Sequence, residues 1–386
     1  MKSIFAALSV ILLLYIFTFY VDGEMGVILC SFIFFAPLIS MIFAVYARKR
    51  ISVSLSCDGY VKKDSTVNVQ VKIAKTGVFP LAVVEIMPGV SEVFEPVNKT
   101  YRITLIGEDE KEFTIPVKAK TGGNGEIRIE SVCSCGFLGF MKLKANDIIP
   151  PPQSVGVIPE IPQASSSSQL FRAIANIVMT SDNDEENDTA MLYSANTSPG
   201  YEHREYILGD PMKRVNWKLS TKKNKLMIRL DEAVASVQPV IVLDLFRRSG
   251  QDISAAVVNE EALLKAVFGL LTGLVRQGIS CTFLYNNAAG ETVSEDVNNP
   301  EIPEQLLLKV LAVKVTPDKR VAISQANSKV CACVIGTTDC GEGLSSMTDR
   351  IESVDNISII GTSSEQDNPT DIPMWYLDGD NNFKQV

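Results

Sequence analysis

Two long apolar runs stand at the beginning of the chain. The first extends from Ile4 to Val21, and the second extends from Met25 to Ala47 with only two serines inside it. Each run approaches the ~20 residues that a helix needs to cross a bilayer. A cleaved signal peptide does not fit, because no small-x-small site precedes the second run and that run follows almost at once. The pattern therefore predicts two membrane-spanning helices.

The charges around these runs predict their orientation. The loop 22–24 reads Asp-Gly-Glu, whereas Lys2 precedes the first run and Arg-Lys-Arg at 48–50 follows the second. Positively charged flanks stay on the cytoplasmic side of a membrane. We therefore expect residues 1–50 to form a hairpin anchor in the cell membrane, a multi-pass topology with two spans and with the N- and C-termini in the cytoplasm. Neither run contains a charged residue, so we expect anchoring rather than ion transport.

Between 51 and 148 the pattern changes to short alternating stretches. Val67–Ile73 alternates apolar and polar side chains with a period of two, which is typical of a strand with one solvent-facing side. Tyr101–Leu105 and Phe113–Val117 repeat this pattern, and turn signals such as Met87-Pro88-Gly89 separate the stretches. Several short strands without a helical period predict an antiparallel, immunoglobulin-like β-sandwich. Nothing in this domain resembles a catalytic set.

Residues 149–199 are expected to be a linker. The prolines at 150–152 and the serines at 165–168 favour extended, flexible backbone. A short helix is predicted around Leu170–Met179, and the five carboxylates of 181–188 predict a solvated loop. That acidic segment lacks the spacing of a calcium-binding EF-hand. Its other candidate role is to neutralise the basic stretch that follows it.

Beyond 238, strand-like runs alternate with helical periods. Pro239–Leu245 is a short apolar run of the kind buried on both faces of a sheet, and Glu260–Gln277 has a broad apolar helical face. Strand, helix, strand and strand are then expected at Ile279–Tyr285, Glu304–Val313, Val330–Gly336 and Ile357–Gly361. This alternation predicts a doubly wound α/β domain with mostly parallel strands.

Charge singles out one stretch of the chain. The whole chain has a formal net charge of −9, yet residues 200–229 carry eight basic and three acidic residues. The stretch also contains the only histidine, His203, and one of the two tryptophans, Trp217. Such a reversal of charge marks a surface for an anionic partner or an internal ion-pair network. Trp217 is expected to dock this stretch against an apolar core.

The eight cysteines are scattered and do not form a metal motif. The Cys133-x-Cys135 and Cys331-x-Cys333 pairs are spaced more closely than the ligands of structural zinc sites. Residues two apart on a strand face the same side, so we expect these cysteines to be small core side chains. We expect no metal and no cofactor, and reduced thiols in the cytosol.

The basic stretch resembles the signature of the domain of unknown function 58 family. Members show Arg-x-Tyr, then Gly-Asp, then an arginine followed shortly by Trp-Lys and a closing arginine. The matching positions here are Arg204, Tyr206, Gly209, Asp210, Arg214, Trp217, Lys218 and Arg229. The resemblance implies that 200–386 holds this signature and a von Willebrand factor A-like domain with a doubly wound sheet.

Such domains often bind a divalent cation at the carboxyl end of the first strand. The motif is Asp-x-Ser-x-Ser, whose oxygens suit a hard cation. Asp244 stands at the first position here, but Phe246 and Arg248 replace the serines. An aromatic ring cannot ligate a cation and a guanidinium repels it. We therefore expect no metal at Asp244, and expect its carboxylate to pair with Arg247, Arg248 or a basic residue of the signature.

The sequence offers little catalytic chemistry. It contains no phosphate-binding loop and no nucleophile elbow, and His203 has no second histidine to work with. We therefore expect a non-catalytic, membrane-anchored interaction or adaptor protein, and the resemblance implies a MoxR-type AAA+ ATPase as its partner. The alternatives are a module that binds anionic lipid or nucleic acid through 213–229, and an unrecognised hydrolase using Asp210, Asp244 and His203. The acidic body of the chain argues against nucleic acid, and no small-molecule substrate is indicated.

Overall fold

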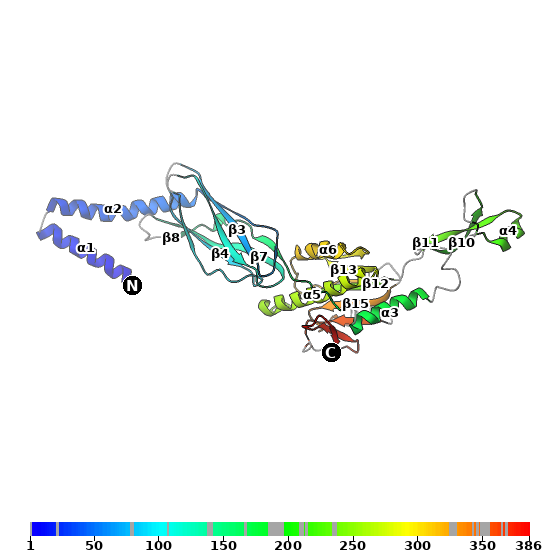
Figure 1. Ribbon diagram of the computed structural model, residues 1–386. Coiled ribbons are helices and arrows are strands. Elements are labelled where there is room, and N and C mark those ends of the chain that lie inside the picture. The colour runs from blue at the N-terminus through cyan, green and yellow to red at the C-terminus, as the bar shows by residue number, and fades with distance from the viewer. Residues whose placement is uncertain are drawn as a thin grey trace. The chain divides into compact units, whose positions relative to one another are not determined.

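The computed structural model divides into two units (Figure 1), which are described separately. The first comprises Met1–Lys120 and Gly125–Val155, and the second comprises Thr121–Asn124 and Gly156–Val386. The residues that the structure describes are 2–20, 23–77, 81–105, 108–136, 142–165, 168–183, 197–207, 212, 215–233, 238–323, 330–341, 343–344, 347, 356–363, 366 and 370–386.

Two helices begin the first unit, α1 (Lys2–Tyr20) and α2 (Gly23–Arg48). Helix α2 is long and apolar enough to span a membrane, while α1 contributes a shorter apolar stretch, Ser9–Tyr20. The two helices touch where Gly26 meets Thr18, because a Cβ at position 26 would clash with the threonine side chain. A glycine at this position therefore permits the close approach of the two helices.

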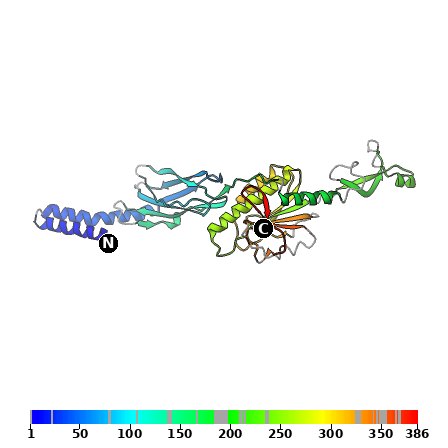
Figure 2. The ribbon, with the colours of Figure 1, turned by 60° about the horizontal axis from the view of Figure 1, so that its bottom comes forward.

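Two sheets form most of the rest of the first unit (Figure 2), and the pairs β1–β3, β3–β6, β4–β5, β4–β7 and β7–β8 are antiparallel. One sheet has the order β1-β3-β6, and the other has the order β2-β9-β7-β4-β5, with β8 paired to β7. In β3, Val67, Val69, Val71 and Ile73 are buried and the residues between them are more exposed, so this strand and its alternation are confirmed. The bounds are β1 (Ile51–Ser56), β2 (Tyr60–Lys62), β3 (Thr66–Lys75), β4 (Leu81–Val90), β5 (Tyr101–Leu105), β6 (Glu110–Lys118), β7 (Gly123–Cys135), β8 (Lys142–Lys144) and β9 (Gln153–Ile158), with a short 3-10 helix at Asn146–Ile148.

The turn expected at Met87-Pro88-Gly89 is wrong, because β4 continues through these residues. The pairing of β4 with β7 instead changes register between Met87 and Pro88. Proline has no N–H to give to the ladder, so it favours such an irregularity within a strand as well as a turn.

The last turns of α2 pack against the strands of the same unit. Ala44 and Ala47 are buried, and the Ser134 hydroxyl of β7 donates a hydrogen bond to the Ala44 carbonyl at 3.4 Å. At the end of the helix, Arg48 forms an exposed ion pair with Asp147 at 3.4 Å. Protein rather than solvent or lipid therefore covers one side of this end of α2.

Much of the expected 149–199 linker is folded. Strand β9 belongs to the five-membered path of the larger first-unit sheet, and α3 (Gln169–Asn183) extends the predicted helix at both ends. Leu170, Phe171 and Ile174 of α3 are buried in the core of the second unit. The acidic residues 184–188 lie outside the described residues. An amphipathic helix with one apolar face explains why this segment folds onto a core rather than remaining extended.

A seven-stranded sheet forms the centre of the second unit, with the order β14-β13-β12-β15-β16-β17-β18. The five central strands, β13, β12, β15, β16 and β17 in sheet order, pair in parallel. The edge strands β14 and β18 pair antiparallel with their neighbours. The bounds are β12 (Gln238–Asp244), β13 (Cys281–Asn286), β14 (Thr292–Val297), β15 (Val330–Thr337), β16 (Ile357–Ile360), β17 (Met374–Leu377) and β18 (Phe383–Gln385). The four predicted strands are present, whereas β14, β17 and β18 were not predicted.

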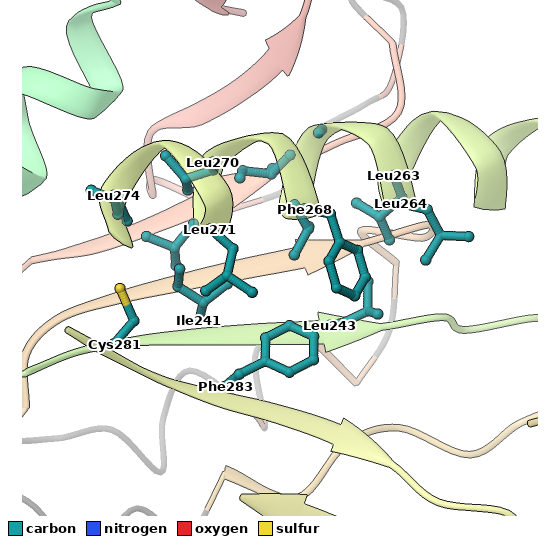
Figure 3. Packing of buried hydrophobic residues seen from close by; sticks show 14 of the residues in the cluster. Ile241, Leu243, Leu263, Leu264, Phe268, Leu270, Leu271, Leu274, Cys281 and Phe283 are labelled. Atoms are coloured by element: carbon teal, nitrogen blue, oxygen red, sulfur yellow. The ribbon is translucent and has the colours of Figure 1, made fainter. Parts of the chain in front are cut away.

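Helix α5 (Ile253–Arg276) covers one face of this sheet and begins earlier than the periodicity predicted. Its apolar side chains lie over those of β12 and β13, namely Leu263, Phe268 and Leu271 over Ile241, Leu243 and Phe283 (Figure 3). Leu170 of α3 and Leu306 of α6 (Ile302–Leu311) belong to the same apolar cluster. Among the described residues, the opposite face is covered by Val321 and by Leu344 and Met347, which have helical backbone. The helices α3, α5 and α6 thus contribute to the apolar cluster on one face of the sheet.

Candidate functional site

The strand order of the large sheet reverses beside β12. The chain proceeds from β12 to β13 and β14 on one side, and then to β15, β16, β17 and β18 on the other. In open α/β sheets, ligands bind outside the carboxyl ends of the strands at such a reversal. Strand β12 ends at Asp244 and β15 ends at Thr337, so these two side chains mark the position.

Asp244 is fully buried and is held by three different residues. Its Oδ2 accepts hydrogen bonds from Arg320 Nη1 at 2.7 Å and from the Thr337 hydroxyl at 3.0 Å. Its Oδ1 accepts from the backbone N–H of Val321 at 3.2 Å. Arg320 is itself only 12% exposed, so this is a buried ion pair. A positive charge therefore occupies the position in front of Asp244 where a cation would bind.

Two further contacts hold the Arg320 side chain in place. Its Nη2 donates to the Asp339 backbone carbonyl at 3.0 Å, and its guanidinium lies 4.1 Å from the centre of the Phe246 ring. A guanidinium over an aromatic face is attracted by the ring quadrupole. Phe246, which replaces the first serine of the cation motif, thus supports the arginine that takes the cation's position.

Arg247 and Arg248, two of the expected partners of Asp244, pair with other carboxylates. Arg247 pairs with the buried Glu260 of α5, with Nη2 and Oε1 2.7 Å apart. Arg248 pairs with Asp339, with Nε and Oδ2 2.8 Å apart, and is more than half exposed. Arg320 was missed because it lies 76 residues from Asp244 in a loop without a motif. Only the three-dimensional fold brings the two together.

Burial raises the pKa values of several groups in and near the site. Burial raises the pKa of Asp244, against the opposing influence of Arg320 and of the three hydrogen bonds. Burial likewise raises the pKa of Glu260, against the influence of Arg247. Nearby, burial together with Asp339 raises the pKa of the Cys340 thiol to about 11. A thiol with such a pKa is almost wholly protonated at neutral pH and is a poor nucleophile.

A positive charge lies among the oxygens of the site. The oxygens that face the position of a cation are those of Asp244, Thr337 and Asp339, but the Arg320 guanidinium lies between them. Within the described ranges, no group of three His, Cys, Asp or Glu side chains could hold a metal ion. A nearby cavity of about 40 Å³, lined by Leu243, Tyr285 and Lys319 among others, has room for little more than one or two water molecules.

The signature stretch forms a separate two-stranded sheet with a short helix. Strand β10 (Thr197–Glu205) pairs antiparallel with β11 (Met227–Ala233), and α4 (Trp217–Lys223) lies beside β11. Val215, Met227 and Ile228 are buried, which gives this substructure a small apolar centre. The Ser220 hydroxyl accepts a hydrogen bond from the Met227 N–H at 2.9 Å and so ties the helix to the strand.

Asn216 connects the histidine to this helix. Its Oδ1 accepts a hydrogen bond from the Leu219 N–H at 3.2 Å, as an N-cap residue does, and its Nδ2 lies 2.8 Å from His203 Nε2. Because the amide nitrogen can only donate, Nε2 is the acceptor in this contact. His203 thus belongs to the β10–β11 sheet and Asp244 to the large sheet, and no contact between the two is described.

The remaining signature residues are described in part. Gly209, Asp210 and Arg214 lie outside the described residues. In the backbone ladder Arg229 stands opposite His203. The Tyr206 N–H donates to the Leu226 carbonyl at 2.8 Å, and Arg204 Nη1 donates to the Glu205 carbonyl at 3.2 Å.

Trp217 is not the core anchor that the sequence suggested. It is 59% exposed on the first turn of α4, and Lys218 beside it is exposed as well. The anchoring residues of this stretch are the smaller Val215, Met227 and Ile228 instead. An aromatic residue next to alternating apolar residues is compatible with a core or with a surface, so the pattern alone could not distinguish the two.

Comparisons with known proteins do not assign a family. No protein-family model and no curated protein matches the chain. Among solved structures, the CARDB domain of a Pyrococcus furiosus protein is 15% identical, with a TM-score of 0.23 over 28% of this chain and 94% of that chain. A cohesin module from Clostridium perfringens is 9% identical, with a TM-score of 0.24 over 29% of this chain and 98% of that chain.

A third similar structure is the alpha-2-macroglobulin of Escherichia coli, with 19% identity and a TM-score of 0.23. The match covers 29% of this chain and only 17% of that one. TM-scores as low as these carry no argument about activity or partners.

Proposed function

We propose that this chain is a non-catalytic, membrane-anchored interaction protein. The observation that supports this most is the Asp244–Arg320 pair, buried at the place where α/β proteins commonly bind ligands. A carboxylate that is already neutralised, beside thiols with raised pKa values, suits a stable recognition surface better than acid–base or nucleophilic chemistry.

We further propose that 238–386 is a von Willebrand factor A-like domain, as the resemblance of the signature implies. The order of the strands, with the first three on one side and the later ones on the other, supports a sheet of this kind. The partner in this proposal is a MoxR-type AAA+ ATPase, and it rests on the resemblance alone.

For the anchor, we propose that α1 and α2 cross the membrane as a hairpin with both termini in the cytoplasm. Support comes from the span-length helix α2, the shorter apolar stretch of α1, and the basic residues that flank them. The packing of Ala44 and Ala47 against the β-strands supports an exit from the bilayer before the end of α2.

Affinity purification of the full chain from native membranes in mild detergent tests this function. We expect an AAA+ ATPase to be recovered with the wild-type chain and lost with Asp244→Ala, which leaves Arg320 buried without its partner. Lys111→Ala, at an exposed lysine of β6 in the first unit, is the control and should recover the ATPase normally. Failure to recover any ATPase with the wild-type chain would contradict the proposal. Recovery of the ATPase by Asp244→Ala at the wild-type level, under conditions in which the α/β domain of the variant is unfolded, would also contradict it.

A further inference from the structure

Helix α4 has one face committed to packing and one face open to solvent. Ser220 is buried on the packed face, where its hydroxyl accepts from the Met227 N–H. Residues three or four apart are neighbours on a helix surface. Trp217 and Thr221 are therefore neighbours, as are Lys218 and Lys222, and all four are exposed. The open face thus presents one large aromatic ring beside two ammonium groups.

Three large apolar side chains in and around α4 are exposed to solvent. Trp217 is 59% exposed, and the apolar Met212 and Leu226 on either side of α4 in the sequence are 51% and 39% exposed. Exposed apolar groups gathered among polar residues mark interaction sites, and tryptophan is enriched among the residues that dominate binding energy. Such a ring contributes a large contact area when a partner covers it.

In the part of the chain that the structure describes, the lysines of this face have no ion-pair partner. No ion pair joins Lys218, Lys222 or Lys223 to any residue in the described part of the chain, whereas Lys225 pairs with Glu205 at 2.6 Å. Like charges four residues apart on a helix repel each other. A partner with carboxylates would remove this repulsion. The charge of the face is thus complementary to an acidic ligand.

We infer that the face formed by Trp217, Lys218, Thr221 and Lys222 binds an acidic peptide segment that carries an apolar anchor residue. This inference rests on the proposed interaction function and names the chemistry of the partner. The partner's apolar side chain packs on the Trp217 ring, and its carboxylates lie against the two lysines.

An anionic membrane surface fits this face less well. A helix that lies in a membrane interface presents a continuous apolar face to the lipid. Helix α4 has only seven residues, and its less polar side is already packed against β11. One ring between two lysines is a suitable centre for a protein interface, but it is a small area for insertion among lipid chains.

The test is a selection of phage-displayed peptides on the full chain in detergent micelles. We expect the selected peptides to be rich in Asp and Glu around one aromatic or aliphatic residue. Their affinity should fall at least about tenfold with Trp217→Ala and with Lys218→Glu/Lys222→Glu. It should be unchanged with Lys111→Glu/Lys120→Glu, which makes the same charge change at exposed lysines of the first unit. Trp217→Phe should retain most of the affinity.

Several results would overturn the inference. They are a selection without acidic enrichment, equal binding by the variants, binding of phosphatidylserine vesicles in place of peptides, and self-association that depends on Trp217. The two proposals fail separately. If Lys218→Glu/Lys222→Glu still recovers the ATPase from membranes, the adaptor function stands and this surface is wrong. If the acidic peptides bind but no ATPase is recovered, the surface stands and the partner class is wrong.

Discussion

Replacement of Arg320 by methionine tests the buried ion pair at the end of β12. The change removes the guanidinium that lies 2.7 Å from Asp244 Oδ2, while the bonds from Thr337 and Val321 can remain. Removing one partner of a buried pair leaves an uncompensated charge and costs ~3–5 kcal/mol. Asp244 is 1% exposed and Arg320 is 12% exposed, so water can offset little of this cost. We expect the free energy of unfolding of the second unit to fall by that amount near neutral pH.

The pH dependence of the loss gives a second check. Burial raises the pKa of Asp244 above its ordinary value of 3.8, and without Arg320 the main opposing influence disappears. A carboxyl whose folded pKa exceeds its unfolded pKa binds more protons when folded, so stability falls as pH rises through that interval. The Arg320→Met variant is therefore expected to recover stability as pH is lowered toward the unfolded pKa. Its deficit relative to wild type should be largest at neutral pH.

Denaturant unfolding of the full chain in detergent measures this loss, followed by the fluorescence of Trp375, which is buried in β17. The double variant Asp244→Asn/Arg320→Met removes both charges and is the matched control. It should be considerably more stable than Arg320→Met alone, because no buried charge is left unpaired. A loss below ~1 kcal/mol, or the same loss at every pH, would refute the reasoning about this pair.

Three further predictions follow from burial. Trp217→Ala should leave the melting temperature nearly unchanged, because the ring is 59% exposed; a large drop in scanning fluorimetry would show that the ring is covered. Leu271→Ala in α5 should reduce the free energy of unfolding by ~2–5 kcal/mol, since Leu271 is fully buried over the sheet, and denaturant titration would show if the site tolerates the loss. Burial raises the pKa of Cys333 to about 12 and, with Asp339, that of Cys340 to about 11. Both thiols should therefore resist alkylation by iodoacetamide at pH 8 until the chain unfolds. Rapid labelling of either cysteine in the native chain, detected by mass spectrometry, would contradict this.

Local periodicity made the regular elements of the second unit predictable. The runs at 239–245, 279–285 and 330–336 are predominantly apolar because both faces of these central strands are covered. Edge strand β14 has the polar sequence Thr-Val-Ser-Glu-Asp-Val, since one of its sides has no neighbouring strand, so it carries no such signal. Strand β18 is only three residues long, too short for a period to be recognised.

The candidate site was predictable only at its first residue. Asp244 could be located because it ends an apolar run, and the residues at 246 and 248 argued against a cation. Its true partner depends on a loop 76 residues away, and pairing at that separation leaves no local pattern. The exposure of Trp217 was unpredictable for a similar reason, because the smaller Val215, Met227 and Ile228 fill the apolar centre beside it.

Binding of Mn²⁺, followed by electron paramagnetic resonance on the full chain in detergent, tests most directly whether Arg320 takes the place of a cation. We predict that the wild-type chain leaves the signal of free Mn²⁺ unchanged at neutral pH, as Asp244→Asn does. One Mn²⁺ bound per wild-type chain, and lost in Asp244→Asn, would contradict the account, because the arginine would then have to leave the carboxylate to admit the metal.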